Sequence, residues 1–299
     1  MSRTRANVAK KVSIGLAATL LLAGCSGDGD ASGDGEPTEP IKFGIISGWY
    51  DGIIVANIWQ ELLVEEGYEV EFVEIADAGP LYSAAASGAV DIISSQLPTT
   101  HGVYLEEYGD DLEDLGVYQD NALLTLAVPE YTDINSIAEL NDHADELGGR
   151  IIGIEAGSGL NTTTRNSVFP AYGLEENFEL VESSTAAMLA ELGNAIDNEE
   201  DIVVTLWRPY WANTAYPVKD LEDPELAFGE TETLHLTANH EFSSRFPEVA
   251  DRMGEFWLSD EQYGEIENMI VNEYDDGEAA QAVRDWLDAN PEFRSALTE

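Results

Sequence analysis

The sequence predicts an α/β fold with two lobes that are joined by two crossing segments. Short apolar runs alternate with stretches of helical spacing between residues 41 and 93, and the pattern starts again between residues 150 and 207. Strand–helix–strand units of this spacing are typical of a mostly parallel sheet with helices on both faces. A chain of 299 residues is long enough to give each of two sheets its own core.

The first run of elements begins at Ile41. Short or alternating apolar runs predict strands at Ile41–Ile46, at Tyr68–Ile75 and from Val90 onward. Apolar residues at helical spacing predict helices at Gly52–Glu66 and Leu81–Ser87. The order of strands and helices favours parallel neighbours in one sheet.

The second run begins with the apolar sequence RIIGIE at Arg150–Glu155. After this predicted strand come a glycine turn, a helix to about Tyr172 and a strand at Phe178–Val181. A helix at Thr185–Ile196 and a strand at Ile202–Trp207 complete the run. We expect a second sheet from these elements.

Two extended segments, Leu123–Val128 and Leu234–Ala238, are expected to cross between the lobes. The rest of the chain, Phe242–Thr298, has helical spacing. Ligands of open α/β sheets bind at the carboxyl ends of the strands, which here would face a cleft between the lobes. We therefore predict lobe 1 at residues 41–125 and 237–299, and lobe 2 at residues 126–236.

The first 25 residues have the features of an export signal. Basic residues precede the apolar segment Val12–Ala23, which is too short to span a bilayer comfortably. It leads into Leu22-Ala23-Gly24-Cys25, and Cys25 is the single cysteine of the chain. A small-residue site ending in cysteine resembles the bacterial lipobox, so we predict lipidation of Cys25 and an extracytoplasmic position on the outer face of the cell membrane. The alternative is a free thiol behind an ordinary signal.

The stretch Ser26–Pro40 is rich in glycine, proline and acidic residues and holds no large apolar side chain. Such a composition cannot bury a core, which predicts a flexible linker over residues 26–40.

The chain is strongly acidic. It has 13 Lys and Arg against 59 Asp and Glu, a formal net charge of −46. Nucleic acid and anionic membrane surfaces are therefore poor partners for this chain. We interpret the excess as an adaptation to high salt, where mobile ions screen the repulsion between carboxylates, although it would also concentrate cationic ligands.

Two tryptophans stand where predicted strands end. Trp49 follows the first strand in SGWYDG, and Trp207 ends the strand in VTLWRPYW, where the proline after Arg208 favours a turn. An indole ring at a strand tip either packs in the core or binds something, and the sequence leaves both readings open for Trp49.

Two further segments carry polar groups. IEAGSGLNTTT, Ile154–Thr164, lies between a strand and a helix, and its glycines let backbone N–H groups face an anion. A lysine after the glycines is missing, so a nucleotide P-loop is excluded. SSQLPTTH places His101 at the start of a helix, where capping or packing is the commoner role. Indole rings together with such donors suit a small zwitterion with a quaternary ammonium, since each cation–π contact contributes about 0.5–2 kcal/mol.

Collinear segments from Phe43 almost to the C-terminus resemble one family. They include SGWYDGIIVANIW, DAGPLYSAAASGAVDI, LPTTH, GGRIIGIEAGSG and IVVTLWRPYW. The chain is similar to the glycine-betaine binding proteins of ABC importers. The resemblance implies a two-lobe periplasmic-binding-protein-like (type II) fold hinged by the two crossing segments, without a cofactor or bound metal.

The resemblance also implies a site. Trp49 and Trp207 match two of three tryptophans that form a cage around the trimethylammonium group. The backbone N–H groups of Gly159 and Leu160, with the side chain of His101, match the positions that hold the carboxylate. Capture would proceed by closure of the lobes, and the closed protein, expected as a monomer, would dock on a permease driven by an ATPase subunit.

Gln96 departs from the family pattern, because a tryptophan of the cage normally stands before Leu-Pro-x-Thr-His. Either a neighbouring aromatic ring fills the gap or the Gln96 carbonyl accepts a hydrogen bond from the ligand. The second reading favours carnitine, choline or dimethylglycine over glycine betaine. The candidate rings are Tyr50, Tyr82, Tyr210 and Trp211.

A surface-anchored enzyme of similar architecture is the competing class. The histidines are His101, His143, His235 and His240, and none has a metal-ligand spacing. Ser158 in AGSG lacks the G-x-S-x-G elbow of a nucleophilic serine. We therefore expect a binding protein, either a transport receptor or a sensor.

Overall fold

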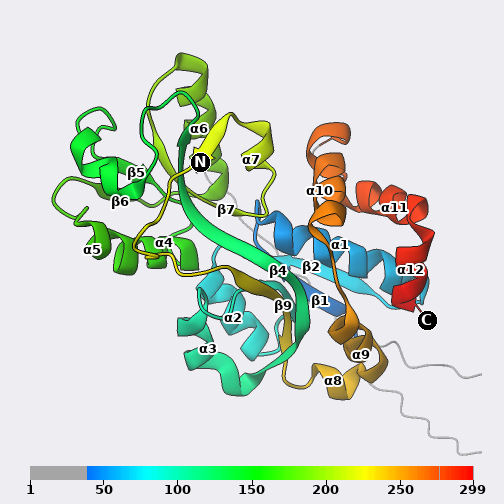
Figure 1. The fold of residues 1–299 in the computed structure, drawn as a ribbon. Coiled ribbons are helices and arrows are strands. Elements are labelled where there is room, and N and C mark those ends of the chain that lie inside the picture. Colours follow the sequence, from blue (N-terminus) through cyan, green and yellow to red (C-terminus); the bar gives the residue numbers. More distant parts are fainter. Residues whose placement is uncertain (1–38, 276, 299) are drawn as a thin grey trace, which may run out of the picture. The chain divides into compact units, whose positions relative to one another are not determined.

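One long strand, β4 (Leu112–Pro129), belongs to two sheets. The computed structural model describes residues 39–275 and 277–298, all within the unit Thr38–Glu299 (Figure 1). The predicted export signal, Cys25 and almost all of the predicted linker lie outside the described residues.

The first sheet has the strand order β2-β1-β3-β9-β4. The strands β1, β2 and β3 are parallel, because helices α1 and α2 carry the chain back so that each strand starts at the same end of the sheet. β9 is antiparallel to both of its neighbours, β3 and β4. The elements are β1 (Ile41–Ile45), α1 (Tyr50–Glu65), β2 (Val70–Glu74), α2 (Ala78–Ala86), β3 (Ile92–Gln96), α3 (Gly102–Tyr108) and β9 (Glu232–Asn239).

The second sheet has the order β4-β7-β5-β6, and β8 pairs with the end of β4. β5 is parallel to both β6 and β7, whereas β4 runs antiparallel to β7. The elements are β5 (Arg150–Ile152), α4 (Gly159–Thr163), α5 (Phe169–Tyr172), β6 (Glu179–Val181), α6 (Thr185–Asn198), β7 (Val203–Arg208), α7 (Ala212–Ala215) and β8 (Val218–Asp220).

β4 changes partners near its middle. Residues Leu112–Ala122 pair with β9, and Leu123–Pro129 pair with β7 and β8 (Figure 1). We call β1–β3, β9, α1–α3 and the C-terminal helices lobe 1, and β5–β8 with α4–α7 lobe 2. This change of partner supports the predicted crossing at Leu123–Val128, while the residue boundaries of the lobes stay a prediction.

Lobe 1 is built on both faces of its sheet. On one face the fully buried Trp59 and Leu62 of α1 pack on β1 and β9 together with the C-terminal helices, and Trp59 contacts Phe256 edge to face at 5.6 Å between ring centroids. Burial of each such side chain contributes about 1.5–3 kcal/mol. α2 covers the opposite face with Leu81 and Ala85. The C-terminal helices are α8 (Phe242–Arg245), α9 (Pro247–Glu255), α10 (Asp260–Asn268), α11 (Ala279–Ala289) and α12 (Pro291–Thr298).

The predicted two-sheet α/β fold is confirmed, with two local differences. The predicted helix up to Tyr172 is interrupted by a π-helical turn at Thr164–Val168, which ends two residues before Pro170. Proline has no N–H to donate to the α-helical ladder. The predicted segment Leu123–Val128 is the end of a strand that begins at Leu112. Among the described residues, no helix has both the length and the hydropathy required to cross a membrane.

Candidate functional site

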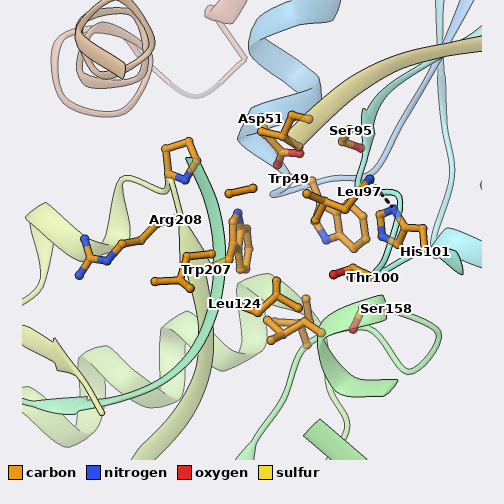
Figure 2. Close-up of a pocket in the computed structure, with 17 residues that line it drawn as sticks. Trp49, Asp51, Ser95, Leu97, Thr100, His101, Leu124, Ser158, Trp207 and Arg208 are labelled. Atoms are coloured by element: carbon orange, nitrogen blue, oxygen red, sulfur yellow. Dashed lines mark hydrogen bonds between the residues drawn. The ribbon is translucent and has the colours of Figure 1, made fainter. Parts of the chain in front are cut away.

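A pocket lies where β4 passes from the first sheet to the second, and both lobes contribute to its lining. It contains about 500 Å³ of space that protein atoms leave empty, part of it open to solvent (Figure 2). Most of its wall is carbon, and its polar groups come from a few side chains. Lobe 1 contributes Trp49, Asp51, Ser95, Leu97, Thr100, His101 and Leu234, lobe 2 contributes Ile154, Ser158, Gly159, Leu160, Trp207, Arg208 and Pro209, and β4 contributes Ala122, Leu123 and Leu124.

Trp49 forms one wall. It precedes α1, and its ring lies parallel to the His101 ring, with 6.1 Å between centroids and 4° between planes. Its indole N–H donates to Glu155 of lobe 2 over 3.2 Å. Trp49 is only 7% exposed, as a packing residue would be, and it also borders the pocket, so its role as a ligand contact stays a prediction.

Trp207 lines the pocket from lobe 2. It lies in β7 opposite Leu124 of β4, and its ring stacks on Tyr210 with 3.9 Å between centroids. Tyr210 therefore supports the indole from behind. Figure 2 shows the two indole rings, Trp49 and Trp207, both bordering the pocket.

His101 is a neutral hydrogen-bond donor in this site. Its Nδ1 accepts from the backbone N–H of Leu97 at 3.2 Å and lies 3.1 Å from the Tyr82 hydroxyl. A backbone N–H can only donate, so Nδ1 is unprotonated and Nε2 carries the hydrogen. Burial lowers the pKa of His101 to about 4, which keeps the ring neutral at pH 7.

The glycine loop meets His101 at the same end of the pocket. Ser158 caps α4 by accepting from the N–H of Asn161 at 3.1 Å, and the first N–H groups of a helix, here those of Gly159 and Leu160, have no acceptor within the helix. A Cβ on Gly159 would lie 2.2 Å from Cγ2 of Thr100 and 3.0 Å from Cδ2 of His101. Only glycine permits this approach of lobe 2 to lobe 1.

Asp51 is a pocket residue that the sequence reasoning missed. Burial raises the pKa of its carboxyl to about 7. Hydrogen bonds from the backbone N–H groups of Asp51 and Gly52 act in the opposite direction but do not outweigh burial. Its position two residues after Trp49 was the signal available in the sequence. The carboxyl places a second, titratable polar group in a pocket with apolar walls.

Gln96 does not line the pocket. Its side chain is buried, and its Oε1 accepts a hydrogen bond from the hydroxyl of Thr237 on β9. The geometry therefore gives no support to a ligand contact by Gln96.

The four aromatic candidates for the missing wall lie behind the pocket lining. Tyr50 contacts Trp211 edge to face at 6.4 Å between centroids, and Tyr210 packs on both Tyr50 and Trp207. Tyr82 packs behind His101, at 5.5 Å between centroids. None of the four is among the described residues that line the pocket, so they hold its walls in place.

Titratable side chains also lie outside the pocket lining. His143 does not line the pocket, and its Nδ1 lies 2.7 Å from Oε2 of Glu146. Within residues 39–275 and 277–298, no group of three or more His, Cys, Asp and Glu side chains is arranged to hold a metal ion.

Residues 39–289 match the family model described as the substrate-binding domain of ABC-type glycine betaine transport systems. The chain belongs to this family. The match covers both sheets and every residue of the pocket.

One curated relative is similar to about half of this chain. The glycine betaine/carnitine transport binding protein GbuC of Listeria monocytogenes is 30% identical over 158 residues, which cover 53% of this chain and 52% of that protein. The chain thus matches about half the length of this curated relative.

Solved structures of the family share the fold. The glycine betaine/L-proline-binding protein ProX of Borrelia burgdorferi aligns with a TM-score of 0.81 and 28% identity over 87% of this chain and 97% of that one. Lactococcal OpuAC, in a closed form with glycine betaine, aligns with a TM-score of 0.79 and 24% identity over 87% and 99% of the two chains.

Proposed function

We propose that this protein is the extracytoplasmic receptor of an ABC importer and that it captures a quaternary ammonium solute, with glycine betaine as the first candidate. One observation carries the proposal. Trp49 and Trp207 from opposite lobes, and the donors of His101, Gly159 and Leu160, border the same pocket. Family membership and the names of its relatives agree with it.

The pocket separates the two ends of a zwitterion. Methyl groups on the cation cannot hydrogen bond, so indole faces replace its hydration and attract it at about 0.5–2 kcal/mol each. The carboxylate accepts from Nε2–H of His101 and from the first N–H groups of α4. Because these groups come from both lobes, the ligand stabilises the closed arrangement over an open one.

Asp51 favours a second candidate, choline. The hydroxyl of choline would donate a hydrogen bond to the Asp51 carboxylate. Glycine betaine has no hydroxyl and could not make this bond. The negative charge of Asp51 would also compensate the net positive charge of choline. The presence of glutamine at position 96 does not help to choose between the ligands, because its Oε1 already accepts a hydrogen bond from Thr237.

We further propose the cellular arrangement that the sequence predicts. Acylation of Cys25 anchors the protein to the outer face of the cell membrane, residues 26–40 act as a linker, and a monomer delivers the solute to a permease and its ATPase. The net charge of −46 is proposed as an adaptation to high salt.

Calorimetric titration with glycine betaine, choline, carnitine and dimethylglycine at high salt tests the proposal. We expect binding of at least one quaternary solute, with the ligand recovered unchanged. If all four fail to bind, or if the ligand is turned over, the proposed function is wrong.

A further inference from the structure

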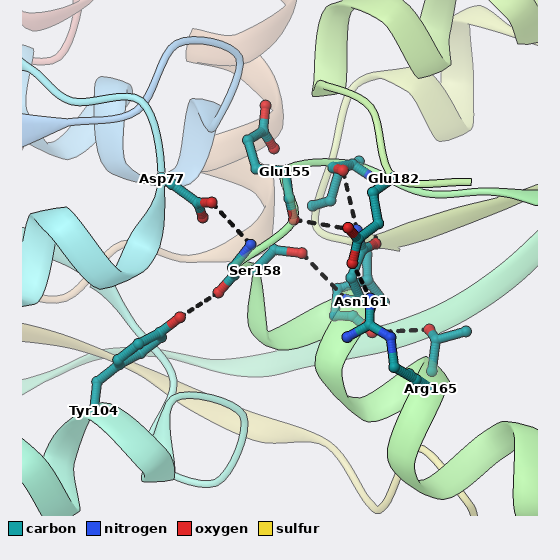
Figure 3. Close-up of polar contacts among 11 residues, drawn as sticks. Asp77, Tyr104, Glu155, Ser158, Asn161, Arg165 and Glu182 are labelled. Carbon is teal, nitrogen blue, oxygen red and sulfur yellow. Dashed lines mark hydrogen bonds and ion pairs between the residues drawn. The ribbon is translucent and has the colours of Figure 1, made fainter. Parts of the chain in front are cut away.

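A single residue of lobe 2, Gly157, is held at both its backbone N–H and its backbone carbonyl by lobe 1. The N–H of Gly157 donates to Oδ2 of Asp77 at 2.8 Å, and the hydroxyl of Tyr104 donates to the carbonyl oxygen of Gly157 at 2.5 Å. Figure 3 shows both side chains reaching the loop next to Ser158. Neither Asp77 nor Tyr104 lines the pocket. We call Asp77, Tyr104 and Gly157 the interlobe clasp.

Contacts within lobe 1 hold the side chains of Asp77 and Tyr104 in place. Asp77 caps α2, and its Oδ1 accepts from the N–H of Ala78 at 2.7 Å, which leaves Oδ2 for Gly157. Tyr104 stacks on Tyr82 with 5.1 Å between ring centroids and 17° between planes. Burial and the nearby Asp77 raise the pKa of Tyr104, so its hydroxyl remains a donor at neutral pH.

Gly157 itself is adapted to this contact. A Cβ at this position would lie 2.8 Å and 2.9 Å from the two carboxylate oxygens of Asp77. Any other residue would push the carboxylate away from the N–H that it binds. The loop then continues through Ser158 to Gly159 and Leu160, the N–H groups assigned to the ligand carboxylate.

We infer that Asp77 and Tyr104 are positioning residues that hold the lobes closed and the glycine loop in register without touching the ligand. The inference rests on the proposed function, because it concerns the closure that captures the solute. The clasp forms only when the lobes meet, so it raises the population of the closed form in the absence of ligand. Apparent affinity scales with that population, whatever the ligand is.

A clasp and a ligand contact have different signatures. Weakening the clasp reduces the fraction of protein in the closed form. The apparent Kd of every ligand then rises by the same factor. Removing a pocket side chain changes the ratio of affinities between ligands, because each ligand uses that side chain differently. The ratio therefore distinguishes the two roles.

Tyr104→Phe is the sharpest variant, because it removes the hydroxyl and keeps the ring that stacks on Tyr82. We expect Kd to rise roughly tenfold for glycine betaine and for choline, about 1.4 kcal/mol each, with their ratio unchanged. Tyr274→Phe is the matched control, since its hydroxyl bonds to Asp285 at 2.5 Å within lobe 1. Unchanged affinity in Tyr104→Phe, or a shifted ratio, would overturn the inference.

A second measurement does not need the ligand. Spin labels at the exposed positions Asp197 of lobe 2 and Asp288 of lobe 1, with Cys25 replaced by serine, report the distance between lobes in the free protein. We expect Tyr104→Phe and Asp77→Ala to move this distribution toward longer distances, and Asp77→Asn to restore part of the short component. An unmoved distribution contradicts the clasp. If no quaternary solute binds the unmodified protein, the proposed function fails while this distance measurement still decides the clasp.

Discussion

The indole N–H of Trp49 in lobe 1 donates to the buried carboxylate of Glu155 in lobe 2, at 3.2 Å. The same carboxylate accepts from the N–H of Thr185 at 2.8 Å and from its hydroxyl at 2.9 Å. Three donors thus compensate the burial of this charge. Glu155 fixes the edge of the indole and leaves the ring face to the pocket.

Glu155→Ala should therefore weaken ligand binding without removing a pocket residue. The variant leaves the Trp49 N–H and the Thr185 donors unsatisfied, at a cost of about 1–3 kcal/mol for a buried group. We expect Kd to rise about tenfold and the melting temperature to fall, with Glu155→Gln intermediate. Calorimetry and thermal unfolding measure both effects, and an affinity within twofold of the parent would contradict this role.

Replacing Trp207 by alanine should reduce the affinity for quaternary ligands. The loss of one cation–π wall costs about 0.5–2 kcal/mol, or roughly 2–30-fold in Kd. Trp257→Ala is the control, because Trp257 is 46% exposed and does not line the pocket. Titration followed by tryptophan fluorescence gives both constants. Equal losses in the two variants would refute the assignment of Trp207.

The affinity for a cationic headgroup should rise with pH through about 7. Asp51 has its pKa raised from 3.8 to about 7, so it loses its proton near neutrality, and a bound cation favours the charged carboxylate. Calorimetric titrations with choline between pH 5.5 and 8.5 test this, and Asp51→Asn should flatten the profile. A profile that keeps its slope in Asp51→Asn would assign the dependence to another group.

The raised pKa of Asp51 should also make the folded protein less stable as pH rises, whereas ligand affinity should increase. The unfolded chain loses the Asp51 proton near pH 3.8, whereas the folded chain keeps it to about pH 7, so this residue's contribution is lost as pH rises between those values. Glu267, with its pKa raised to about 7 by burial, acts in the same direction. We expect the melting temperature of Asp51→Asn minus that of the parent protein to increase as pH rises from 4 to 7, because asparagine does not titrate. A constant difference over that range would contradict the shifted pKa.

Gly159→Ala should abolish high-affinity binding. Its Cβ would lie 2.2 Å from Cγ2 and 2.6 Å from the carbonyl oxygen of Thr100, and a backbone carbonyl of lobe 1 cannot yield as a flexible side chain does. We expect Kd to rise at least 100-fold in calorimetry. Gly264→Ala is the matched control, since a Cβ there meets no atom within 4 Å in helix α10. Retained affinity in Gly159→Ala would show that the lobes need not approach this closely.

Periodicity in the sequence predicted the two-sheet fold, because strands and helices here have clear apolar patterns. Trp49, His101, Gly159, Leu160 and Trp207 were each predicted as site residues and lie in one pocket. Trp49, Trp207, His101 and the glycine loop drew attention because they stand near predicted strand ends, where α/β sheets place their ligands. The roles of His101, Gly159 and Leu160 in holding a carboxylate were implied by the family resemblance.

Contacts across the lobes could not be predicted in the same way. The Trp49–Glu155 bond joins residues 106 positions apart, and the Asp77–Gly157 bond joins residues 80 apart. No local pattern marks either partner. Asp51 was missed for a different reason, since an acidic residue at the start of a helix, here α1, is ordinarily solvated.

The position of Gln96 shows a further limit. Alternation along a strand predicts which side chains share a face, but the pairing of β3 with β9 shifts its register between Ile93 and Gln96. The face of Gln96 therefore does not follow from counting, and its side chain meets Thr237.

The course of β4 has a consequence for how a ligand would act on the protein. Ala122, Leu123 and Leu124 line the pocket at the point where this strand leaves one sheet for the other, and its pairing with β9 shifts register just before, between Gln119 and Ala122. If the lobes rotate about β4 as the proposed function requires, a solute held there would contact the backbone that bends. Binding would then act directly on the hinge, without a relay of side chains.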